Sequence, residues 1–219
     1  MPSQTFNRML WALALLLIVV FGFQARDQIE AVYAGVGSLD VRDAPEDDTV
    51  YLRWKGKIDA PMAARIEEAF RAHKASRRRF VLSLTSPGGS LSHGAHVIGL
   101  LRAISKTHVL ETVIDKSSRC ASMCVPVYLQ GQRRTASASA RFMFHEVSFR
   151  EFHSREEQEV SDKAKGTATD RLFADYFATA GVPDGWIKTV RARMAGGNDI
   201  WKTGRELADE NAGIVQQVF

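Results

Sequence analysis

Segments with the pattern of strands alternate with segments with the pattern of helices along most of this 219-residue chain. Strand-like stretches cover residues 49–54, 80–85 and 108–114, and a helix-like stretch follows each of them. This alternation is typical of an α/β domain whose mostly parallel sheet is covered by helices. We therefore expect one α/β domain over residues 49–219, with ligands bound at the carboxyl ends of the strands.

The N-terminal region has a different composition. An unbroken apolar run covers residues 9–23, close in length to the hydrophobic part of a signal peptide and shorter than the roughly 20 residues that span a bilayer. We expect residues 1–25 to form a hydrophobic helix that is either a cleaved signal peptide or a retained membrane anchor, with a buried core helix as the alternative. The domain would then lie outside the cytoplasm, in the periplasm or anchored at the inner membrane. Residues 26–48 are rich in small and acidic residues, which is typical of a linker.

The charge pattern excludes one class of partner. The net charge is +4, and the basic clusters at residues 77–79 and 133–134 have no interleaved aromatic residues. We therefore expect no nucleic-acid partner.

The two cysteines, Cys120 and Cys124, are four positions apart. In an exported protein such a pair predicts a disulfide, because Cα atoms at this spacing fall within bridging range. The bridge would fix the bend that presents Ser122, and free thiols are the alternative. We expect no metal ion and no cofactor, since further ligands at a metal-binding spacing are missing nearby.

Polar or glycine-rich segments follow three of the expected strands. Ser122 lies where a strand passes into a helix, and the N–H groups at a helix start can stabilise negative charge, although a simple helix cap is the alternative. Gly88 and Gly89 let the backbone approach a ligand closely, and a tight turn is the alternative. His145 ends a short strand.

Ser122, His145 and the later Asp199 are the residue types that acyl transfer requires. A neutral serine is a poor nucleophile until an imidazole takes its proton, and a carboxylate then holds the tautomer of the imidazole and stabilises its cation. We interpret the apolar stripe at residues 172–177 as core or subunit interface rather than as a cofactor site.

These segments resemble, in the same order, the sequence blocks of the proteolytic subunit of Clp protease. The matching blocks are residues 56–59 (GKID), 86–90 (SPGGS), 120–123 (CASM), 142–145 (FMFH), 199–203 (DIWKT) and 211–215 (NAGIV). They extend over nearly the whole expected domain. The paired cysteines and the apolar N-terminus make the chain more similar to exported Clp-protease-like bacterial proteins than to the cytosolic enzyme.

The resemblance implies a spiral of ββα units, the fold shared by Clp protease and crotonase. It implies that Ser122 is the nucleophile, His145 the general base and Asp199 the orienting acid. The backbone N–H groups of Gly89 and Met123 would form the oxyanion hole. We also expect a homo-oligomer that binds extended peptide or protein substrates.

The sequence departs from that family at three places. Glu146 and Val147 replace the Gln-Pro that usually follows the histidine, Asn198 replaces an arginine used in ring contacts, and Gly166 interrupts a helix expected over residues 154–180. A stacked double ring is therefore not assumed. No phosphate-binding Gly-x-x-x-x-Gly-Lys-Ser/Thr motif occurs, and export would separate the chain from a cytosolic ATPase partner.

The leading hypothesis is an ATP-independent serine endopeptidase that cleaves exposed or unfolded segments. A non-catalytic peptide-binding or scaffold protein is the alternative, suggested by the unusual residues after His145. Acyl-CoA chemistry on the same fold is disfavoured by export, and a serine–lysine peptidase would need Lys116 as its base.

Overall fold

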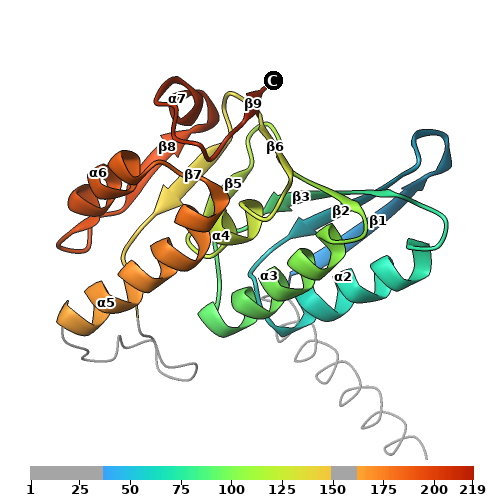
Figure 1. Cartoon of the computed structure of the whole chain (residues 1–219), viewed down its shortest axis with the longest axis horizontal. Helices are drawn as coiled ribbons and strands as arrows, with labels where there is room; N and C mark the ends of the chain where they lie inside the picture. The colour runs from blue at the N-terminus through green and yellow to red at the C-terminus, as the bar shows by residue number, and fades with distance from the viewer. Residues whose placement is uncertain (1–36, 149–161) are drawn as a thin grey trace, which may run out of the picture. The chain divides into compact units, whose positions relative to one another are not determined.

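The computed structural model describes residues 37–148 and 162–219 (Figure 1). The hydrophobic helix expected over residues 1–25 and the linker up to residue 36 lie outside the described residues. No helix in the described part is both long enough and apolar enough to cross a membrane.

A six-stranded sheet forms the larger layer of the domain. Its strands, in their order across the sheet, are β1 (Ser38–Ala44), β2 (Thr49–Lys55), β3 (Arg79–Thr85), β4 (Val109–Ile114), β6 (Arg133–Ala136) and β9 (Gln217–Val218). Strand β1 runs antiparallel to β2, and every other neighbouring pair is parallel. The mostly parallel α/β sheet predicted from the sequence is therefore confirmed.

The linker prediction for residues 26–48 is wrong from Ser38 onward. Residues Ser38–Ala44 form edge strand β1, which pairs with β2 along its whole length, and Pro45–Asp47 form a 3-10 turn, η1. Most of β1 is exposed, so its acidic and basic residues resemble those of a linker. The strand is specified by its long-range pairing and by the Asp43–Arg77 ion pair, neither of which is visible in local composition.

A second sheet of three strands carries the residues singled out by the sequence. It contains β5 (Arg119–Ala121), β7 (Arg141–Phe144) and β8 (Ile200–Thr203), in that order. Strands β5 and β7 are parallel, so their carboxyl ends lie at one edge, and antiparallel β8 begins at the same edge. An isolated bridge from Ser86 to Cys120 connects this sheet to the end of β3.

Helices connect the strands and cover the core. They are α2 (Ala60–His73), α3 (Leu91–Ser105), α4 (Cys124–Tyr128), α5 (Asp162–Leu172), the π-helix η2 (Phe173–Phe177), the 3-10 helix η3 (Ala178–Ala180), α6 (Asp184–Met194) and α7 (Gly204–Asp209). Helices α2 and α3 lie side by side (Figure 1), and their buried faces include Met62, Ile66 and Leu101. The helix expected over residues 154–180 is described only from Asp162, and it changes to π and 3-10 geometry before ending at Ala180, where Gly181 follows in a left-handed conformation.

Candidate active site

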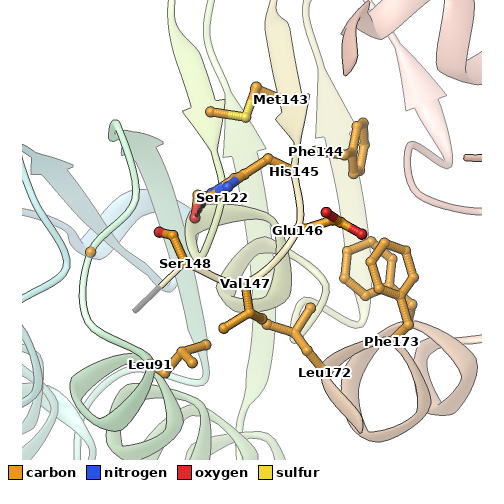
Figure 2. Close-up of a pocket in the computed structure, with 12 residues that line it drawn as sticks. Leu91, Ser122, Met143, Phe144, His145, Glu146, Val147, Ser148, Leu172 and Phe173 are labelled. Carbon is orange, nitrogen blue, oxygen red and sulfur yellow. Dashed lines mark hydrogen bonds between the residues drawn. The ribbon is translucent and has the colours of Figure 1, made fainter. Parts of the chain in front are cut away.

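The Ser122 hydroxyl and the His145 imidazole form a hydrogen bond in which Oγ and Nε2 are 2.7 Å apart. Figure 2 shows the two side chains pointing toward one another. Ser122 directly follows β5 and His145 directly follows β7, and the parallel register pairs Ala121 with Met143. Two residues 23 positions apart in sequence are thereby placed side by side, at the distance that proton transfer requires.

Ser122 occupies a sharp turn between strand β5 and helix α4. Its φ of 54° lies in the left-handed region, which costs a residue other than glycine about 1 to 3 kcal/mol. The Ser122 N–H donates to the Met143 carbonyl at 2.9 Å, and the Ser122 carbonyl accepts from Val125 N–H at 3.0 Å. These two bonds hold the turn in the conformation in which the Ser122 hydroxyl reaches His145.

A disulfide joins Cys120 and Cys124, which lie two residues before and two residues after Ser122. Their Cα atoms are 5.1 Å apart, and both side chains are fully buried. The bridge closes a five-residue ring with Ser122 at its centre. It therefore ties the end of β5 to the start of α4 and restrains the backbone that carries the hydroxyl.

The loop at Gly88 approaches Ser122 more closely than a side chain would permit. Gly88 has φ +99°, and a Cβ placed there would lie 2.7 Å from Ser122 Cβ and 2.9 Å from the Ala121 carbonyl oxygen. Its N–H donates to the buried Ser86 hydroxyl at 3.1 Å. The glycine is thus required by contact with the candidate nucleophile as well as by its own backbone conformation.

Gly89 presents its backbone groups on the side of the loop away from Ile58. The two residues form an isolated parallel bridge, in which Ile58 N–H donates to the Gly88 carbonyl at 2.9 Å and Ser90 N–H donates to the Ile58 carbonyl at 3.2 Å. A parallel bridge of this kind leaves the N–H and carbonyl of the central residue pointing the other way. Among the described residues, neither Gly89 N–H nor Met123 N–H donates a hydrogen bond to a protein acceptor.

Asp199 lies at the same edge of the second sheet. It immediately precedes Ile200, whose pairing with Phe144 is the last in the register of β7 and β8, and among the described residues no hydrogen bond or ion pair joins Asp199 to His145. Asp199 and His145 both line a polar cavity of about 790 Å³. The structure therefore brings Ser122 and His145 into direct contact and puts Asp199 on the wall of a cavity that His145 also lines.

A second, smaller cavity of about 60 Å³ lies against the same pair. Besides Ser122 and His145, its walls are mostly apolar and include Leu91, Met143, Val147, Leu172, Phe173 and Phe177. The last two come from the π-helix η2, a geometry that is frequent at functional sites, and their rings stack with centroids 4.2 Å apart. Glu146 lines both cavities.

Part of this wall was not predicted as part of the site. The interpretation of the stripe at residues 172–177 as core is confirmed, because Phe173 and Phe177 belong to the hydrophobic core and Leu172 and Tyr176 pack against it. Leu172, Phe173 and Phe177 also line the small cavity, which was not predicted. The apolar stripe was the only signal, and its periodicity is the same for a core face and for a cavity wall. Lys116 lies in the exposed loop after β4 and lines neither cavity.

No metal site is evident in the described residues, where no group of three or more His, Cys, Asp or Glu side chains is placed to hold an ion. Comparison of the sequence with protein-family models gives no match, and comparison with curated proteins gives none either. The function is therefore argued from the geometry of the site.

Proposed function

We propose that this chain is a serine endopeptidase of the Clp protease type, with the spiral ββα fold of that family. It cleaves exposed or unfolded peptide segments outside the cytoplasm without ATP, as a homo-oligomer. The observation that supports the proposal most is the 2.7 Å contact between Ser122 Oγ and His145 Nε2 at a strained turn. The buried Cys120–Cys124 disulfide supports an oxidising compartment.

The chemistry begins when His145 Nε2 takes the hydroxyl proton while Ser122 Oγ bonds to the carbonyl carbon of the substrate. The carbonyl electron pair moves onto oxygen, where the Gly89 and Met123 N–H groups stabilise it. Collapse of this intermediate breaks the C–N bond, and His145 gives its proton to the leaving amine. Water, activated by the same imidazole, then hydrolyses the acyl ester. Asp199 would hold the tautomer in which Nε2 accepts.

The outward-facing backbone of Gly89 favours an extended substrate. A peptide lying along this loop can accept from the Gly89 N–H or donate to its carbonyl as an added strand. A side chain of that peptide would then enter the small cavity beside Ser122, whose walls are mainly apolar. We therefore expect cleavage after small or medium apolar residues.

A non-catalytic peptide-binding protein is the second candidate. It would use the same loop and cavities, and the observation that favours it is the Glu146 carboxylate beside His145, on the wall of both cavities. The two candidates differ in whether bound peptide is cleaved.

Incubation of the purified protein with a reduced, carboxymethylated protein tests the proposal. We expect cleavage without nucleotide, no stimulation by ATP, and new carboxyl ends that are mostly apolar by mass spectrometry. The matched sample is Ser122→Ala. Binding of the unfolded protein with no cleavage would favour the second candidate.

Gly88→Ala is expected to lower kcat/KM by about 100-fold or more, because the added Cβ would displace the Ser122 side chain and small displacements at a reacting centre have large effects. Steady-state kinetics with a fluorogenic peptide measure this. Gly99→Ala is the matched control, because a Cβ at Gly99 meets no atom within 4 Å. Equal activity of the two variants would show that the Gly88 loop does not constrain the nucleophile.

Replacing both cysteines with alanine is expected to lower the free energy of unfolding by about 2 kcal/mol, the value that chain entropy gives for a five-residue ring. We also expect kcat to fall, because the ring holds the Ser122 turn. Denaturant unfolding and peptide hydrolysis measure the two effects. Adding reductant should lower the free energy of unfolding and kcat of the parent protein and leave both unchanged in the double variant. If full reduction changes neither quantity in the parent, the disulfide does not hold the Ser122 turn.

A further inference from the structure

The segment that follows His145 is attached to helix α5 by a buried hydrogen bond. The Val147 N–H donates to the Thr169 hydroxyl oxygen at 2.9 Å, and Thr169 is fully buried. The Thr169 hydroxyl in turn donates to the Lys165 carbonyl one helical turn earlier, at 2.8 Å. Because its own proton is committed to that carbonyl, the hydroxyl oxygen is held with a lone pair toward the Val147 N–H.

This bond fixes the chain two residues beyond the candidate base. On the other side, Phe144 is held by its pairing with Ile200 and by edge contacts of its ring with Trp186. Phe144 and Val147 are both buried, at 4% and 7% exposure. His145 and Glu146 therefore form a two-residue span between fixed points.

The Thr169 hydroxyl makes two hydrogen bonds: it accepts from the Val147 N–H and donates to the Lys165 carbonyl in its own helix. A valine of the same shape would fill the same buried space, but it would leave the Val147 N–H without its acceptor. Position 147 also matters, because a proline there would have no N–H to donate. The pair thus links the His145 segment to the helix whose next turn supplies Leu172 to the cavity wall.

We propose that Thr169 is a positioning residue that holds the His145 imidazole against Ser122. The expected effect of Thr169 on kcat rests on the proposed function. Its effect on the position of the His145 imidazole does not. Loss of the bond frees the segment after His145, so that Nε2 is no longer kept at hydrogen-bond distance from the Ser122 hydroxyl.

The test compares three variants of the full chain. Thr169→Val removes the acceptor, and Thr169→Ser keeps it. Thr112→Val is the matched control, because Thr112 is also fully buried and its hydroxyl donates to a carbonyl, that of Tyr128, outside both cavities. Thermal unfolding of all three measures the loss of stability common to any buried threonine.

Two readouts separate positioning from stability. We expect Thr169→Val to lower kcat by about 100-fold with KM changed by less than about twofold, Thr169→Ser to restore kcat, and Thr112→Val to leave kcat unchanged. In carbon–proton NMR spectra, the His145 ring signal should shift or split in Thr169→Val alone. The spectra do not depend on turnover.

Unchanged kcat and an unchanged His145 ring signal in Thr169→Val would overturn the inference. If the parent protein hydrolyses nothing, the proposed peptidase function fails, and the ring signal alone then decides whether Thr169 positions His145. A ring signal that changes equally in Thr112→Val would also overturn it, since the effect would then follow from general loss of stability.

Discussion

Replacing Ser122 with alanine is expected to abolish peptide hydrolysis, with kcat lowered by about 10⁶-fold, as happens when the nucleophile of such a triad is removed. The hydroxyl that bonds to the carbonyl carbon is then missing, and His145 has no proton to take at the 2.7 Å contact. Peptide binding should persist, because the Gly89 backbone and the apolar cavity walls remain. Steady-state kinetics and a separate equilibrium binding measurement test both parts.

Ser118→Ala is the matched control for this variant. Ser118 immediately precedes the first residue of β5, and it lines neither cavity. Its activity should stay close to that of the parent. If Ser122→Ala hydrolyses peptide as fast as Ser118→Ala does, Ser122 is not the nucleophile.

Asp199→Asn is expected to lower kcat by about 10⁴-fold while the domain stays folded, because an amide at this position favours the wrong tautomer of the base. The expectation rests on the role proposed for Asp199 and on the polar cavity that Asp199 and His145 both line. Asp199 is exposed, so the substitution leaves no buried group unpaired. Kinetics and denaturant unfolding of the same sample measure the two properties.

The exposed Asp209, on α7, provides the comparison for this substitution. Asp209→Asn carries the same change of charge and should leave kcat unaltered. A similar kcat for the two variants would mean that Asp199 does not orient the imidazole and that the relay has another third member.

The larger sheet was largely predictable from the sequence. Strands β2, β3 and β4 were predicted to within a residue or two, because their buried residues alternate or run together in the pattern of strands. Strand β1 was missed, since an exposed edge strand depends on pairing with β2 rather than on apolar periodicity. Strands whose side chains are buried were therefore predicted, and the exposed edge strand β1, which depends on long-range pairing, was not.

The candidate site was predictable only in part, for a similar reason. Ser122 and His145 could be singled out by residue type, position after a strand and family resemblance. Their contact depends on a separate sheet of β5, β7 and β8, and β5 has only three residues, too few to show a period. The left-handed turn at Ser122 and the bond from Val147 to Thr169 are also long-range consequences of packing, with no local signal.

The most direct test of the central claim is the mass of the protein after treatment with a fluorophosphonate, which phosphonylates an activated serine. The account predicts one adduct per chain, mapped to the peptide that contains Ser122. No adduct should form when the protein is unfolded before treatment or when His145 is replaced by alanine, because both remove the imidazole from the hydroxyl. A well-folded parent protein that takes up no label, or that is labelled at another residue, would contradict the assignment of Ser122 as an activated nucleophile.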